Sequence, residues 1–301
     1  MAFWPSIIII VSAIMHAGWN VLGKSNSHSR MAFFLASSVT AALILTPYLI
    51  WFVVTVGIDA LENDFWLLLI SSGVFQMIYL LGLANAYRQA DISVIYPIAR
   101  ALPVLMVGFG TVLMGYSLSY NEWFGFILIT AGCLFVPLSQ FGELKLKAYL
   151  NFGVFWALFA AIGTTGYSII DKEALSDLDI LVSIQFPSYF SAVFYLGIQY
   201  WAICASLCLR LLLSNNKQEF MIAWSIRKRS AVAGIMMSST YGLVLFAMTM
   251  TDNVSYVVAL RQISIVFGLG MGIYFLKEKW YLTRGVGVAC ITSGLIIALC
   301  F

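Results

Sequence analysis

Two arginines, Arg100 and Arg261, stand inside stretches of sequence that are otherwise apolar. If these stretches cross a membrane, each charge costs about 2.5–3.5 kcal/mol on insertion scales, so each marks a candidate functional site. A guanidinium is a planar fork of donors that binds a carboxylate or a phosphate through two hydrogen bonds. The pair therefore predicts a binding site for an anionic group. The alternative is structural, with each arginine bonded to helix-end carbonyls or tyrosine hydroxyls.

A polar pattern also runs along the first apolar stretch. Four residues recur there at every fourth position: Ser12, His16, Asn20 and Lys24. This spacing places them on one face of a helix, and a polar face of a membrane helix must point into the bundle. We expect His16, Trp19 and Asn20 to line a pathway. His16 titrates near neutral pH, which makes it a candidate for proton coupling, and the alternative is a hydrogen-bonded core histidine.

The elements that position these residues follow from the composition. Of the 301 residues, 62% are hydrophobic and only 10% are charged, whereas soluble chains are near 25% charged. This balance excludes a soluble enzyme, a nucleic-acid-binding protein and a secreted disulfide scaffold. A spanning helix needs about 20 apolar residues. The all-helical membrane protein is predicted to have ten spans, at 5–23, 31–56, 65–87, 92–115, 122–141, 150–170, 183–210, 231–250, 254–276 and 282–301.

The connections between these spans are short. The longest polar one, from Leu213 to Ser230, is too short to fold as a domain. The first apolar run follows Pro5 without a basic start or a cleavage site, so we expect a retained helix and not a signal peptide. Pro97 and Pro103 remove backbone donors on either side of Arg100, which predicts a bend in the fourth span.

Three sets of residues recur in the same order in the two halves of the chain. Gly18-Trp19-Asn20 with Lys24 corresponds to Gly166-Tyr167-Ser168 with Lys172; Asp91 and Arg100 correspond to Asp252 and Arg261; and Gly125 and Gly132 correspond to Gly287 and Gly294. The sequence thus predicts two five-helix halves, residues 1–141 and 150–301. Because five is odd, the second half must enter the membrane in the opposite direction. Inverted repeats of this kind are typical of secondary transporters, whose substrate binds near the midplane.

Two further expectations concern packing and orientation. Gly268 and Gly270 are expected to allow close contact between helices. Besides Arg100 and Arg261 the chain has 14 Lys and Arg residues, and 13 of them fall in connections on one side of the membrane, with only Lys172 on the other. The positive-inside rule puts the basic side in the cytoplasm, so both termini are predicted outside it.

Several segments resemble the EamA type of the drug/metabolite transporter superfamily. They are Leu276-Lys277-Glu278-Lys279 and the run from Ala86 to Pro97. The start, His16-Ala17-Gly18-Trp19-Asn20, and the run from Val254 to Arg261 resemble a bacterial subgroup, some members of which are linked with phosphonate use. The resemblance implies a bacterial inner membrane and a ten-helix fold of two inverted halves. It also implies both termini in the cytoplasm, the reverse of the charge count.

The resemblance also implies which side chains meet the substrate, because the third, fourth, eighth and ninth helices line the central cavity in that family. The corresponding residues are Gln76, Tyr79, Tyr96, Arg100, Tyr241, Tyr256, Arg261 and Gln262. Phosphate translocators of the same superfamily use basic residues on the ninth helix, which favours Arg261 over Arg100.

These observations favour a secondary transporter that moves a small anionic or zwitterionic metabolite, such as an amino acid, phosphonate or organophosphate, by alternating access. An exporter of amino acids or cationic amines is the alternative, although a cation site would prefer a mid-span carboxylate and the predicted spans have none. A non-transporting receptor or structural protein belongs to a different class. The sequence has no ATP-binding loop. We expect a small-molecule substrate and the lipid bilayer as partners, no cofactor, metal, enzymatic activity or nucleic acid, and function as a monomer.

Overall fold

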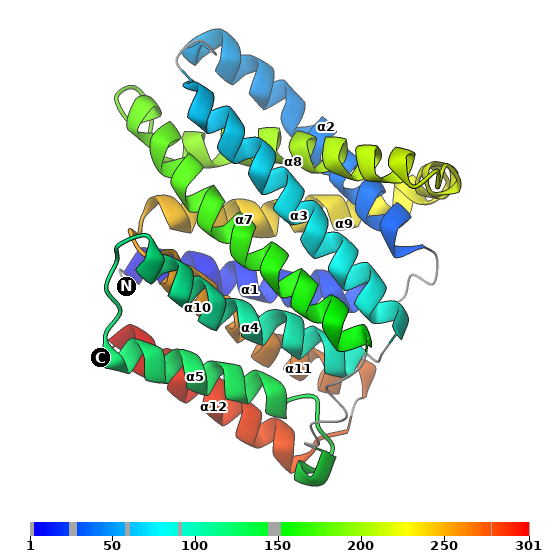
Figure 1. The fold of residues 1–301 in the computed structure, drawn as a ribbon, viewed down its shortest axis with the longest axis vertical. Helices are drawn as coiled ribbons and strands as arrows, with labels where there is room; N and C mark the ends of the chain where they lie inside the picture. Colours follow the sequence, from blue (N-terminus) through cyan, green and yellow to red (C-terminus); the bar gives the residue numbers. More distant parts are fainter. Residues whose placement is uncertain are drawn as a thin grey trace.

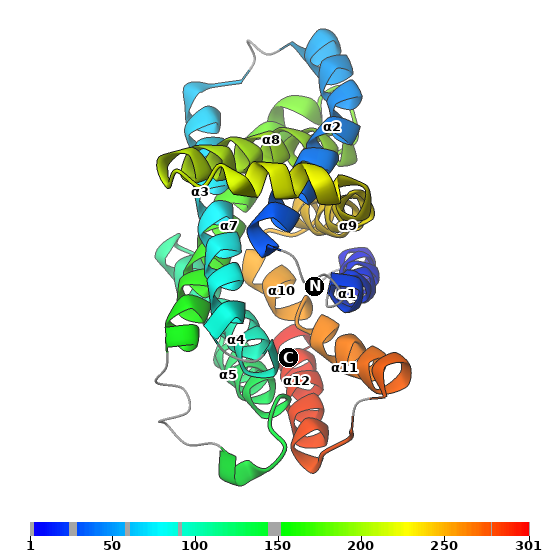
Figure 2. The same cartoon turned by 90° about the vertical axis from the view of Figure 1, so that its right-hand side faces the viewer.

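The computed structural model shows a bundle of helices (Figures 1 and 2) and describes residues 3–23, 29–57, 61–89, 92–143, 152–277 and 279–300. Its helices are α1 (Phe3–Gly23), α2 (Arg30–Val56), α3 (Asn63–Gln89), α4 (Ile92–Leu113), α5 (Tyr120–Phe135), η1 (Phe141–Glu143), α7 (Phe152–Val182), α8 (Tyr189–Leu213), α9 (Gln218–Thr249), α10 (Val254–Leu260), α11 (Ile263–Leu276) and α12 (Leu282–Cys300). With α10 and α11 as two parts of the ninth span, the predicted ten-helix fold is confirmed. Among the described residues, seven helices are long and apolar enough to cross a membrane, and Phe3–Gly18 and Ala99–Leu113 are shorter apolar helices.

Two helices are longer than the apolar pattern predicts. The sixth span was expected to end at residue 170, but α7 continues to Val182. The connection Leu213–Ser230 was expected to be a polar loop, but α9 already begins at Gln218. Figure 2 shows the first turns of α9 running across one end of the bundle before the helix turns into it. Polar residues therefore interrupt the hydropathy of both segments without interrupting the helix.

The ninth span is broken where the sequence predicted one continuous helix. At the break the backbone tightens: the amide of Gln262 bonds to the carbonyl of Ala259, and that of Ser264 bonds to the carbonyl of Arg261. This pattern leaves the Val258 carbonyl without its usual partner, and the Gln262 side-chain amide donates to it at 2.9 Å. The fourth span is one uninterrupted helix, α4, and the bend that its prolines predict stays a prediction.

Helix pairs in the bundle come in matching sets. α3 packs on α7 and α1 packs on α9, which are equivalent contacts if the two halves are repeats. α5 packs on α12 and α2 on α8, each pairing one helix with its own counterpart. Viewed along the spans, α1, α7, α9 and α10 surround the middle of the molecule (Figure 2). This packing agrees with an inverted repeat, while the boundaries 1–141 and 150–301 stay a prediction.

Glycines set the distance between α5 and α12. A Cβ on Gly125 would lie 2.6 Å from the carbonyl oxygen of Gly294, and a Cβ on Gly132 would lie 2.6 Å from that of Gly287. The two pairs that recur in the sequence thus meet each other. The packing expected of Gly270 is wrong, because nothing lies within 4 Å of a Cβ built there.

The two ends of the bundle differ in charge. Helices α1, α3, α5, α8 and α11 finish at one end of the bundle, on the right in Figure 1, and both marked ends of the chain lie at the other. We call the first the basic end, because Arg88, Arg210, Lys217 and Arg284 stand in the helix turns beside its connections. Lys172 was predicted in a connection at the opposite end. It lies instead within α7, where its Nζ donates to the carbonyl of Met248 at 3.0 Å and so caps the end of α9.

We predict that Gly132→Ala destabilises the bundle by about 1–3 kcal/mol, because the added methyl meets the α12 backbone, which cannot rotate away. Thermal unfolding of the purified protein in detergent measures this. Gly270→Ala, with open space around it, is the matched control and should leave the melting temperature unchanged or higher. Equal melting temperatures for the two variants would contradict the role given to the α5–α12 contact.

Candidate functional site

Arg261 stands at the break between α10 and α11. Its side chain is only 8% exposed, and its guanidinium lies over the ring of Tyr241 on α9, with Cζ 5.6 Å from the ring centre. Among the described residues its guanidinium donates no hydrogen bond and forms no ion pair. The attraction of a cation for a ring face therefore holds Arg261 while its donors stay available to a ligand.

Arg100 and His16 meet the same region from other helices. Arg100, on α4 and 7% exposed, donates from Nη2 to the Ser264 hydroxyl at 2.6 Å. Ser264 lies in the first turn of α11, so Arg100 joins α4 to the helix that follows the break. His16, on α1, is close enough for the charges of both arginines to act on its ring. The structure thus brings together three basic side chains that the sequence singled out.

Three tyrosines connect this region to α3. The ring of Tyr241 meets Tyr167 of α7 edge to face at 5.8 Å, and Tyr167 meets Tyr79 of α3 in the same way at 5.9 Å. Helices α3 and α7 approach closely enough for this because Gly82 and Gly163 face the partner backbone, with a Cβ on either lying 2.5–2.6 Å from a backbone nitrogen. The three rings thus form a row that extends from Arg261 to α3.

Asp171 is the interior residue that the sequence analysis missed. It is fully buried on α7 and accepts four hydrogen bonds. The donors are the hydroxyls of Ser72, Tyr195 and Tyr241 and the side-chain amide of Gln199, the Tyr195 and Gln199 bonds measuring 2.8 and 2.7 Å. Each carboxylate oxygen accepts two of them, which satisfies an ionised carboxylate in a buried site.

A sequence signal for Asp171 does exist. Buried positions on α7 recur at Thr164, Ser168, Asp171, Leu175 and Leu178, every three or four residues. This helical period passes straight through the charged pair Asp171-Lys172. The hydropathy criterion stopped the span at residue 170, so the statement that no carboxylate lies mid-span is wrong. Asp171 stands 11 residues before the end of α7 at Val182, about 16 Å along the axis.

Of the remaining predicted residues, Gln76 and Gln262 are buried, Tyr256 lies elsewhere, and the others fall outside the described part of the chain. Gln76 is buried on α3 one turn from Tyr79. Gln262 has its amide nitrogen on Val258, while its buried Oε1 accepts no hydrogen bond from any described residue. Tyr256 lies apart, with its side chain beside Glu122 at the start of α5. The side chains of Trp19, Asn20 and Tyr96 and all of Glu278 lie outside the described residues.

Comparison with known proteins identifies a related family and a similar fold. Residues 3–138 match the model of the EamA-like transporter family. The resemblance to the drug/metabolite transporter superfamily is confirmed. The EamA match indicates a multi-pass membrane transporter of that type. One solved crystal structure, described only as that of a protein, has a TM-score of 0.70 with 14% identity, over 98% of this chain and 97% of that chain, and shows the same fold. No curated protein matches the chain.

Within the described part of the chain, no group of three His, Cys, Asp or Glu side chains is placed to hold a metal ion. The interior instead presents one available guanidinium, a second one held by a hydroxyl, a histidine, a row of tyrosines and a satisfied carboxylate. Side chains of this kind can bind a small molecule through charge and aromatic contact.

We predict that Tyr241→Phe lowers the unfolding free energy by about 0.6–1.7 kcal/mol, the range for hydrogen bonds between membrane helices, and that Asp171→Asn lowers it more because the new amide faces donors. In a double-mutant cycle the two effects should couple. Tyr274→Phe is the control, since Tyr274 is exposed on α11. The assigned network is wrong if Tyr241→Phe and Tyr274→Phe have the same effect, or if the Tyr241 and Asp171 variants add independently.

Proposed function

We propose that the protein is a secondary transporter of a small anionic or zwitterionic metabolite, of amino-acid, phosphonate or organophosphate type. Arg261 carries the proposal: its guanidinium is buried at a helix break and has no acceptor among the described residues. Broken spans are where membrane transporters expose charged groups and backbone to their substrates. In this scheme an acidic group of the substrate binds the Arg261 fork through charge-assisted hydrogen bonds.

The neighbouring side chains take complementary roles. Arg100, held by Ser264, adds positive charge and ties α4 to α11, the helix that follows the break. Tyr79 and Tyr167 offer ring faces and edges to the rest of the substrate, with Gln76 beside them, and a substrate ammonium group meets the rings or the Gln262 Oε1. His16, which feels both arginine charges, is the proposed proton-coupling group, with Trp19 and Asn20 along the same helix.

Alternating access would follow from the two halves. Residues 1–141 and 150–301 form the two repeats in this proposal, and the site lies between α1 and α4 of the first half and α9 to α11 of the second. Movement of one half against the other would open the site to each side in turn. A complete pair of repeats in one chain favours a functional monomer.

A cationic amine is the second candidate substrate, and Asp171 is the observation that favours it. A buried carboxylate beside two tyrosines, Tyr195 and Tyr241, has the composition of a cation site. Against this, all four acceptor positions of Asp171 are occupied by protein donors, whereas Arg261 has open donors. The anionic substrate is therefore the better proposal.

We predict that amino acids, phosphonates or phosphorylated metabolites raise the melting temperature of the purified protein, since a ligand of the folded state stabilises it. Arg261→Ala should weaken that ligand about 10–100-fold, because a hydrogen bond to a charged group contributes about 1.5–3 kcal/mol. Arg261→Lys should fall between, because it keeps the charge but not the fork. Arg227→Ala, an exposed arginine on α9, is the control for charge alone.

The same ligand should then move across liposomes that contain the wild-type protein and not across those with Arg261→Ala. Stabilisation by amines alone, abolished by Asp171→Asn, would favour the second candidate instead. Binding without any flux would favour a receptor. Correctly inserted Arg261→Ala and Arg100→Ala variants that transport at the wild-type rate would refute the arginine site.

We also propose that the protein lies in a bacterial inner membrane with its basic end in the cytoplasm. The prediction is that alkaline phosphatase fused after Phe301 is active, since that enzyme works only outside the cytoplasm. A fusion within the connection between α8 and α9, at the basic end, should be inactive. The reverse pattern would show that the orientation implied by the family resemblance is the right one.

A further inference from the structure

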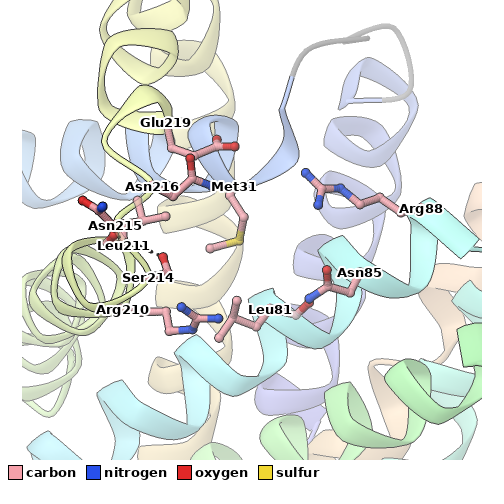
Figure 3. A pocket seen from close by; sticks show the side chains of 10 residues that line it. All are labelled: Met31, Leu81, Asn85, Arg88, Arg210, Leu211, Ser214, Asn215, Asn216 and Glu219. Carbon is pink, nitrogen blue, oxygen red and sulfur yellow. Dashed lines mark hydrogen bonds between the residues drawn. The ribbon is translucent and has the colours of Figure 1, made fainter.

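A cavity separate from the interior site opens at the basic end of the bundle. Its volume is about 340 Å³, and it lies where α3 and α8 end and α2 and α9 begin. Figure 3 shows the head groups of Arg88 and Arg210 on opposite sides of it, each directed toward its middle. The two arginines come from different halves of the chain, so the cavity exists only when the halves are packed together.

Neither arginine has an acidic partner among the described residues. Both stand in the last turn of a helix, where the negative end of the helix dipole favours a cation. This placement explains why each position carries a positive charge. It does not explain why both exposed head groups point into one cavity. Water weakens the repulsion between two such charges, and an anion that lies between them would be attracted by both.

Among the described residues that line the cavity, the one carboxylate, that of Glu219, already accepts hydrogen bonds from the protein. Glu219 accepts a hydrogen bond from the Ser29 hydroxyl and another from the Ala32 amide, at 3.1 Å for the latter. It thereby caps the first turn of α2, in place of an N-cap side chain of that helix. The described lining of the cavity therefore has two guanidiniums and one carboxylate, and that carboxylate is bonded to the start of α2.

A rigid turn supplies the rest of the rim. Asn215 adopts a φ of 53°, a left-handed conformation that asparagine tolerates better than most residues. The amides of Asn215 and Asn216 bond back to Leu212 and Leu211 at 3.1 Å, which ends α8 and directs the chain into α9. On the facing wall, Asn85 donates its amide to the Leu81 carbonyl at 3.0 Å, so its Oδ1 is left to accept from a ligand.

We infer that this cavity binds a phosphate-bearing anion with a hydroxyl-bearing organic part. Arg88 and Arg210 would share the phosphate oxygens, which suit the guanidinium fork. Asn85 Oδ1 would accept a hydroxyl, and the apolar wall of Met31, Leu81 and Leu211 would cover the carbon skeleton. A soluble phosphorylated metabolite and the head group of an anionic phospholipid share this chemistry, and the cavity stands at the end of the bundle where either can reach it.

The test uses the full-length protein in a neutral detergent with three probes: glycerol 1-phosphate, dihexanoyl phosphatidylglycerol and dihexanoyl phosphatidylcholine. Native mass spectrometry measures occupancy, and the melting temperature reports stabilisation. The Arg88→Ala/Arg210→Ala variant should bind the first or second probe at least about tenfold more weakly. Arg227→Ala/Arg229→Ala removes the same charge from the exposed face of α9 and should change the affinity less than about twofold.

Binding of glycerol 1-phosphate as tight as that of the lipid supports a soluble ligand, and binding of phosphatidylglycerol alone supports a lipid head group. The loss caused by Arg88→Ala/Arg210→Ala should also appear in an Arg261→Ala background, which separates this site from the transport site. Equal losses in the two double variants, equal binding of phosphatidylcholine and phosphatidylglycerol, or no binding at all would overturn the inference. An Arg88→Lys/Arg210→Lys variant with partial affinity would show that the fork and not only the charge is used.

Discussion

A buried positive charge and a buried negative charge share one tyrosine in this protein. Tyr241 gives its hydroxyl to Asp171 and its ring face to Arg261. Donation to a carboxylate makes the phenol ring richer in electrons, which strengthens its attraction for the guanidinium. Each charge would be costly alone in a membrane interior. Their joint placement through Tyr241 allows Arg261 to be held without using its donors.

The break in the ninth span determines where the Arg261 side chain lies. A continuous helix would leave no unpaired backbone and would carry the Arg261 side chain on a fixed face. The tightened turn at Arg261-Gln262 ends α10, and the Gln262 side chain satisfies the carbonyl that the break releases. Irregular backbone is stable in a membrane only where protein or a wet cavity covers it. The irregular backbone at the break is therefore stable in the interior, beside α1, α4 and α9. It would not be stable on the face that contacts lipid.

The sequence predicted the fold well because a membrane requires long apolar spans, and such spans are visible in the local composition of the chain. Apolar runs gave ten spans, and the recurring glycines Gly125, Gly132, Gly287 and Gly294 proved to face one another across α5 and α12. Arg100, Arg261 and His16 are brought together as well. Their roles in binding remain proposals.

What the sequence could not give depends on partners in space. Asp171 looked like the end of a span because hydropathy treats a carboxylate as exposed, and only the donors from α3, α8 and α9 make its burial possible. At the break, the Gln262 side-chain amide takes the place of a backbone amide as the donor to the Val258 carbonyl. No local sequence pattern predicts this exchange. Tyr256 has a side chain suited to a binding site, but its position on α10 places it beside Glu122 and away from the arginines.

A structure of the protein with the anion that stabilises it most would test the central claim most directly. The account predicts an acidic group of that ligand within hydrogen-bond distance of the Arg261 guanidinium, with the Tyr241 hydroxyl still on Asp171. A ligand whose acidic group lies away from Arg261, or a cation bound at Asp171 in place of the Tyr241 hydroxyl, would contradict it.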